Sequence, residues 1–151
     1  MKLIGKKGLS GLIEIALIAL MGVAVVLMAL LPVLIPLVTD RVAGDSWYTK
    51  YLVVLLVAGV MAELILWQAR GIMKNVNRGR VFSDDTVRRL RIIAVECLVL
   101  AAFAFVGLFV VTKFFMALVM VAFAIIGAIL FVFAELFRQA IEYKTENDMT
   151  I

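Results

Sequence analysis

The segment ARGIMKNVNRGRVFSDDTVRRLRII, residues 69–93, decides the fold of this chain. It carries 7 of the chain's 15 Lys and Arg residues, and long apolar runs lie on both sides of it. A basic segment between two apolar runs enters hydrocarbon only at high cost, so it must lie at a membrane face, and the positive-inside rule makes that face the cytoplasm. We call this stretch the basic segment. Its cationic residues, which we predict to form a cytoplasmic surface, are Arg70, Lys74, Arg78, Arg80, Arg88, Arg89 and Arg91.

The composition of the whole chain also indicates a membrane protein. Of its 151 residues, 66% are hydrophobic, and the mean hydropathy is +1.15. Soluble domains are about 45–50% apolar, so this chain lacks the polar residues that would cover a soluble core. The single cysteine, Cys97, excludes an internal disulfide, and the chain contains no histidine. We therefore expect neither a zinc or haem site nor any other metal or cofactor.

The apolar runs predict four membrane-spanning helices, because a span needs roughly 20 residues. We expect one domain, residues 1–151, with helices at about 9–38, 47–73, 84–112 and 114–145. The fold class would be an all-α integral membrane four-helix bundle. Pro32 and Pro36 should bend the far end of the first helix. Ser83 is the predicted N-cap of the third helix, with Asp84 and Asp85 in its first turn.

The distribution of positive charge predicts the orientation of these helices. With four spans and both termini inside, 12 of the 15 Lys and Arg residues fall on the cytoplasmic side. The three outside are Arg41, Lys50 and Lys113. Such a bias is a strong orientation signal, so we predict a multi-pass cell-membrane protein with both termini in the cytoplasm.

The last helix is predicted to continue past the membrane as a cytoplasmic extension. Apolar residues recur at helical spacing in ELFRQAIEYKTENDMTI, residues 135–151. We expect Phe137 and Ile141 to pack against the basic segment. The acidic residues of the extension would then meet its arginines; these residues are Glu142, Glu146 and Asp148 on one side and Arg78, Arg80, Arg88 and Arg89 on the other.

The most distinctive polar residues are four glutamates, one in each predicted span: Glu14, Glu63, Glu96 and Glu135. A carboxylate in a bilayer is costly and usually faces a partner or a polar cavity. One interpretation is ion pairing or protonation; examples of such pairs are Glu63 with Arg70, Glu96 with Arg89 and Glu135 with Arg138. The other is a ligand or ion cavity shared chiefly by Glu63 and Glu96, which lie at similar depths. A metal site of four carboxylates is disfavoured, because such sites normally include histidines.

Two motifs resemble hallmarks of a bacterial membrane family catalogued as domain of unknown function 2975. The first is a glycine, a phenylalanine, a hydroxyl residue and an Asn or Asp in a central basic loop, here Gly79, Phe82, Ser83 and Asp85. The second is the ending Asp-hydrophobic-Thr-hydrophobic at residues 148–151. The resemblance covers nearly the whole chain and implies four spans. It assigns no residue a role, since the family has no established activity, but its genes often neighbour a small helix-turn-helix regulator, which implies a cytoplasmic partner.

Three classes of function remain open from the sequence. We expect a regulatory or interaction protein whose basic segment and last helix engage a cytoplasmic partner. The alternative is a small transporter, channel or immunity-type protein that uses the glutamates. An enzyme is not expected, because the chain carries no phosphate loop, nucleophile elbow or zinc signature. Three interpretations account for the positive charge of the basic segment: it fixes the membrane topology, it binds anionic lipid headgroups, or it binds a protein partner. Direct binding of nucleic acid is not expected, because no nucleic-acid-binding fold accompanies the charge.

Overall fold

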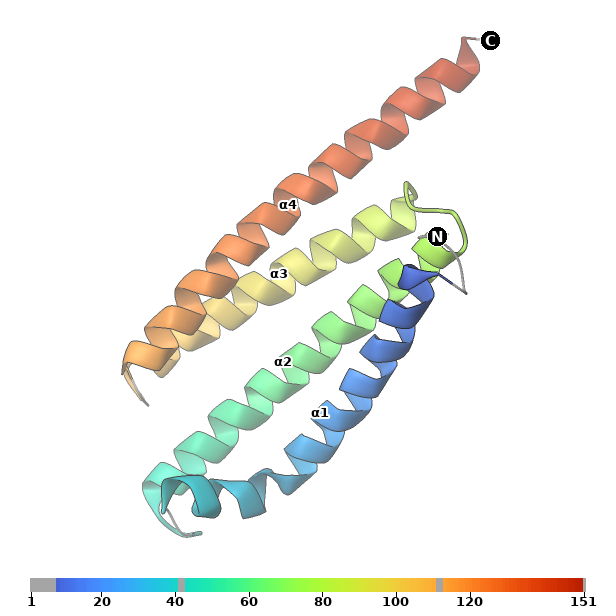
Figure 1. The fold of residues 1–151 in the computed structure, drawn as a ribbon. Helices are drawn as coiled ribbons and strands as arrows, with labels where there is room; N and C mark the ends of the chain where they lie inside the picture. Colours follow the sequence, from blue (N-terminus) through green and yellow to red (C-terminus); the bar gives the residue numbers. More distant parts are fainter. Residues whose placement is uncertain (1–7, 41–42, 111–112, 151) are drawn as a thin grey trace.

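The computed structural model describes residues 8–40, 43–110 and 113–150 of the chain. Within them it contains four helices: α1 (Leu9–Thr39), α2 (Ser46–Asn77), α3 (Asp84–Gly107) and α4 (Lys113–Met149) (Figure 1). All four are long and apolar enough to cross a bilayer, so the prediction of an all-α multi-pass membrane protein is confirmed. The boundaries differ in three places. Helix α2 runs one turn further than predicted, α3 ends earlier, and α4 continues beyond residue 145.

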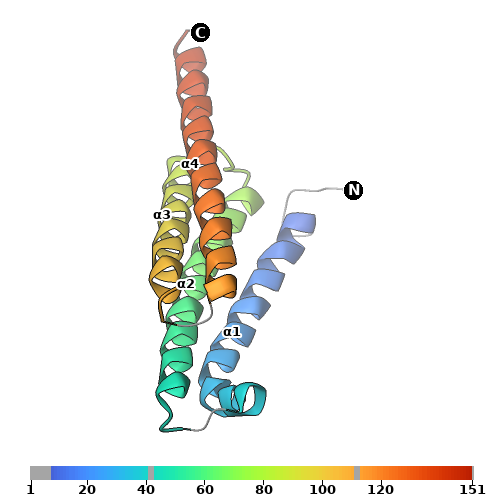
Figure 2. The same ribbon diagram turned by 90° about the vertical axis from the view of Figure 1, so that its left-hand side faces the viewer.

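The four helices form an open row in chain order, so the predicted four-helix bundle does not close on itself. Among the described residues, backbone contacts join α1 to α2, α2 to α3 and α3 to α4, and no other pair of helices. Figure 2 shows α1 standing apart from α4. Closure is not required in a membrane, because lipid tails solvate exposed Leu, Ile and Val as well as another helix does.

Helix α3 is the central element, and small residues let its neighbours approach it. It contributes most of the buried side chains, among them Ala94 and Ala104, which are at most 1% exposed, and Cys97, which is 2% exposed. A Cβ atom at Gly127 of α4 would lie 3.1 Å from the backbone oxygen of Ala94. Small residues on both helices thus bring α3 and α4 close together.

The far end of α1 bends at its two prolines (Figure 2). Pro36 has no N–H group, so the carbonyl of Pro32, four residues earlier, loses its helical hydrogen bond. The hydroxyl of Tyr48 in α2 donates to that carbonyl at 3.4 Å, and Tyr48 is only 9% exposed. A tyrosine from the next helix thus satisfies an acceptor that water does not reach in hydrocarbon.

Helix α4 is the longest helix and projects past the ends of the other three (Figures 1 and 2). Its helical structure is unbroken to Met149, as the predicted continuation past the membrane requires. Every described residue from position 142 onward is exposed. The other three helices therefore do not cover this part of α4.

Candidate functional site

The turn between α2 and α3 is held by hydrogen bonds from side chains of the basic segment. Gly79 adopts φ +72°, a left-handed conformation that favours glycine. Ser83 caps α3 by accepting from the Thr86 N–H at 3.3 Å. The buried Asn75 amide donates to Asp85 Oδ2 at 2.8 Å and to Thr86 Oγ1 at 3.2 Å. These bonds join the last turn of α2 to the first turn of α3.

Asp85 and Arg89 extend this network across the helix pair. Arg89 Nε donates to Asp85 Oδ2 at 2.9 Å, and Arg89 Nη1 donates to Gln68 Oε1 of α2 at 2.9 Å. Asp85 precedes the apolar part of α3, which begins at Ile92. Hydrogen bonds from Asn75 and then Arg89 lower the pKa of Asp85 below its ordinary value, so it is a carboxylate at neutral pH.

Gly71 makes room for the Arg89 guanidinium on the surface of α2. A Cβ atom at this position would lie 2.3 Å from Arg89 Nη1 and 2.4 Å from its Cζ. Any larger residue at position 71 would therefore push the guanidinium away from Gln68. The sequence offered one signal for this role, a glycine in the interior of a predicted helix, and sequence reasoning missed it.

Six of the seven predicted basic residues line a group of adjoining hollows at this end of the molecule. The first hollow, of about 150 Å³, is lined by Trp67, Arg70, Gly71, Lys74 and Arg89. A second, of about 260 Å³, adds Arg78 and Arg80, and a third, of about 220 Å³, adds Arg88. Asp85 is the only acidic residue among their walls. The structure thus gathers these cations, from the end of α2, the loop and the start of α3, into one surface.

The seventh residue, Arg91, contacts the base of the α4 extension. Its Nη2 lies 3.5 Å from Glu135 Oε2, and Glu135 also accepts from Arg138 Nε at 3.0 Å. Beside them the rings of Phe82 and Phe137 lie 5.1 Å apart. The predicted packing of Phe137 on the basic segment and the predicted Glu135–Arg138 pair are both confirmed. Together these contacts set the direction in which α4 leaves the row of helices.

The predicted ion pairs between the end of α4 and the loop arginines are wrong. Glu142 pairs with Arg138 of its own helix. In the described part of the chain, Glu146 and Asp148 form no ion pair with Arg78, Arg80, Arg88 or Arg89. The reason is geometric: α4 is straight and carries its last turns away from the loop (Figure 1).

The four glutamates do not gather into one site. Glu14 of α1 accepts from the Asn77 amide at 2.5 Å, and Glu135 is held by Arg91 and Arg138. Within the described residues, no three Cys, Asp or Glu side chains lie close enough to hold a metal ion. Glu14 and Glu135 therefore serve the α1–α2 and α3–α4 contacts.

Glu63 and Glu96 lie at the same level of the α2–α3 pair. Gly71 of α2 lies against Arg89 of α3. Glu63 lies about 12 Å from Gly71 along α2, and Glu96 lies about 10 Å from Arg89 along α3. Glu63 Oε1 and Glu96 Oε2 are buried and have no hydrogen-bond partner in the described chain. The expected pairs with Arg70 and Arg89 are wrong, since Arg70 lies over Trp67 and Arg89 bonds to Asp85 and Gln68. The shared cavity stays a prediction.

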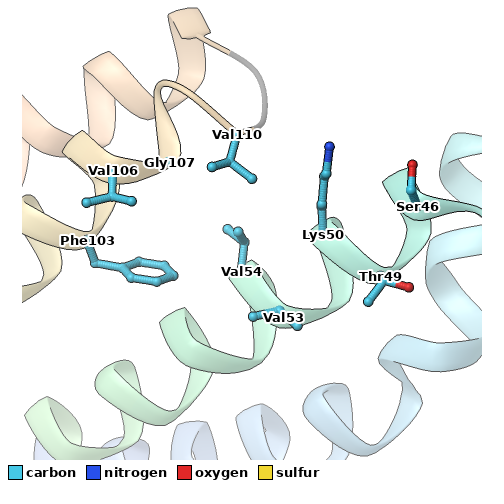
Figure 3. Close-up of a pocket in the computed structure, with 9 residues that line it drawn as sticks. All are labelled: Ser46, Thr49, Lys50, Val53, Val54, Phe103, Val106, Gly107 and Val110. Atoms are coloured by element: carbon cyan, nitrogen blue, oxygen red, sulfur yellow. The ribbon is translucent and has the colours of Figure 1, made fainter.

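The largest of the described cavities lies at the opposite end of α2 and α3, and sequence reasoning did not foresee it. Its volume is about 580 Å³. Figure 3 shows Val54 of α2 opposite Phe103 and Val106 of α3 and Val110 of the turn that follows α3, with Lys50 beside them. Its walls contain neither Glu63 nor Glu96. The two helices separate here between apolar faces. The period of an apolar pattern identifies the face of a helix that packs, but it does not give the distance to the next helix.

Four apolar helices, a cationic loop and a projecting last helix define a multi-pass α-helical membrane protein. The chain belongs to the family described as protein of unknown function (DUF2975), whose family model matches residues 13–151. The resemblance found from the loop and terminal motifs is thereby confirmed. No curated protein and no solved structure shows a significant match.

Proposed function

We propose that this chain is a membrane-anchored interaction protein and not an enzyme. Its spans would hold the basic segment and the end of α4 at the cytoplasmic face of a bacterial cell membrane. There they would engage a soluble protein partner, such as the small transcription regulator implied by the family resemblance. The bias of positive charge toward the loop side supports this orientation.

The observation that carries the proposal is the uncovered end of α4. Tyr143 is 71% exposed and Met149 is 82% exposed, on a helix that stands clear of the other three. Short helices in water are marginal without tertiary packing. A segment that stays helical there and shows an aromatic and an apolar side chain is suited to pack against a partner. Glu146 and Asp148, which form no ion pair with any other described residue, add charge that a basic partner surface would complement.

Site-specific photo-crosslinking in cells tests this proposal. We expect a crosslinker at position 143 to form a discrete adduct with one soluble protein. The matched control is Phe114, which is 83% exposed at the other end of the same helix and should react only with lipid or not at all. A reporter fused after Ile151 should be active only inside the cell. An active reporter outside, or identical adducts at both positions, contradicts the proposal.

A second candidate function rests on the unpartnered oxygens of Glu63 and Glu96. Two carboxylates at one level of a helix pair repel when both are charged, so a proton or cation would be shared between them. A small transporter, channel or immunity-type protein would use such a site. Flux of protons or cations into liposomes, lost in Glu63→Gln and kept in Glu14→Gln, would favour this candidate over the interaction protein.

A further inference from the structure

The hollow between Trp67, Arg70, Gly71, Lys74 and Arg89 has the charge and position of a headgroup site. Three cationic side chains line it and no acidic one does. Asp85, next to it, already accepts hydrogen bonds from Asn75 and Arg89. The adjoining hollows add three more arginines. The hollow is therefore strongly cationic, and its natural ligand is an anion.

The tryptophan places this hollow at the level of lipid headgroups. Trp67 is 56% exposed, and the Arg70 guanidinium lies 5.9 Å from the centre of its ring. Tryptophan side chains favour the boundary between hydrocarbon and water. The apolar part of α2 ends at this residue, and the cations follow within two turns. An anion bound here would lie in the plane of the membrane surface.

The Arg89 side chain is already fixed in position for binding. Asp85 and Gln68 occupy two of its five N–H donors, so three donors remain. The bare surface of Gly71 lets its guanidinium lie against α2. A preorganised guanidinium loses less entropy when it binds a phosphate than a free side chain does.

We propose that this hollow binds the phosphate of an anionic phospholipid from the cytoplasmic leaflet. Arg70, Lys74 and Arg89 would surround the phosphate oxygens, and Trp67 would lie beside the glycerol backbone. The hollow, of about 150 Å³, has room for one phosphate group. This site lies on α2 and α3, apart from the uncovered end of α4 that carries the proposal above, so the two can be tested separately.

Quenching of tryptophan fluorescence by brominated lipids tests the site directly. The chain has two tryptophans, Trp47 and Trp67, so Trp47→Phe leaves a reporter in the hollow and Trp67→Phe leaves one at the opposite end. In bilayers that mix phosphatidylglycerol with phosphatidylcholine, we expect Trp67 to be quenched preferentially by the brominated anionic lipid. Trp47 should show no preference.

Charge variants show whether the selectivity belongs to the hollow. Each cation near an anionic surface contributes about fivefold in affinity, so Arg70→Gln with Lys74→Gln should lower the preference of Trp67 by roughly tenfold or more. Lys144→Gln, which also removes a charge from the cytoplasmic side, should leave it unchanged. Lys74→Arg keeps the positive charge and should keep the quenching preference. This result would show that position 74 tolerates a change of side chain. Equal quenching by both lipids, or the same loss in Lys144→Gln, overturns the proposal.

Inorganic phosphate separates a lipid headgroup from a free anion. If the site is specific for lipid, millimolar phosphate added at constant ionic strength should leave the quenching preference unchanged. Loss of the preference under these conditions would show that the hollow takes a soluble phosphate, which contradicts a lipid site. Crosslinking at position 143 is unaffected by either result, so the two proposals fail separately.

Discussion

The two ends of the α2–α3 pair are held in different ways. At the loop end, side-chain hydrogen bonds of Asn75, Asp85, Thr86, Arg89 and Gln68 join the helices. At the other end the helices separate around an apolar cavity of about 580 Å³ (Figure 3). Hydrogen bonds define one relative position of two helices, whereas apolar surfaces in lipid tolerate many. The loop end is thus the fixed end of this pair.

The largest effect is expected from Asn75→Leu, which removes the centre of the fixed end. Its amide bonds to a carboxylate and to a buried hydroxyl. Losing one hydrogen bond to a charged group and one to a buried hydroxyl should lower the free energy of unfolding by about 2–3 kcal/mol. Denaturation of the detergent-solubilised protein measures this loss. Thr49→Val at the cavity end is the control and should change stability little; equal losses would remove the distinction between the two ends.

Replacing one glycine at each end of the α2–α3 pair compares how tightly the two ends are packed. Gly71→Ala places a methyl group against the Arg89 guanidinium and should destabilise the protein by about 1–2 kcal/mol. At Gly107 the nearest atom to an added Cβ is the sulfur of Met116, at 3.0 Å. This sulfur belongs to a flexible side chain near the cavity. We expect Gly107→Ala to cost less, as judged by the melting temperature in one detergent. A larger cost at Gly107 would show that the cavity end is the more rigid of the two.

Filling the cavity should strengthen the weaker end. Val106 lines the space and is 59% exposed, so Val106→Phe adds apolar contacts without displacing a polar group. Cavity filling commonly stabilises by about 0.5–2 kcal/mol, and we expect the lower part of that range. Thermal unfolding gives the measurement. Destabilisation would mean that the cavity walls are close-packed in the membrane.

The smallest effect is expected from pH at the loop end. Because the folded state lowers the pKa of Asp85, this carboxylate stabilises the fold above its unfolded pKa of about 3.9. The contribution is lost as pH falls through the lower, folded pKa. The melting temperature of the native protein should therefore fall more between pH 6 and pH 3 than that of Asp85→Asn. Parallel pH profiles would show that Asp85 does not contribute.

The sequence by itself determined the number of spans, the position of the basic loop and the start of α3. Hydrocarbon excludes charge and a helix needs a cap, so apolar run length and the Ser83–Asp85 pattern predicted these features. The pairing of Glu135 with Arg138 also followed from helical spacing along one element, and the packing of Phe137 followed from the apolar stripe of the last helix.

Only the tertiary structure decided which residues of different helices meet. The sequence suggested a four-helix bundle, arginine partners for Glu63 and Glu96, and contacts from Glu146 to the loop. The structure has its four helices in an open row, and neither set of ion pairs forms among the described residues. Periodicity defines a face of a helix but not the neighbour that covers it, and in lipid no water forces every apolar face to be covered. The register that brings Asn75 to Asp85, and the space at Gly71 for Arg89, arise from the crossing of α2 and α3 in three dimensions.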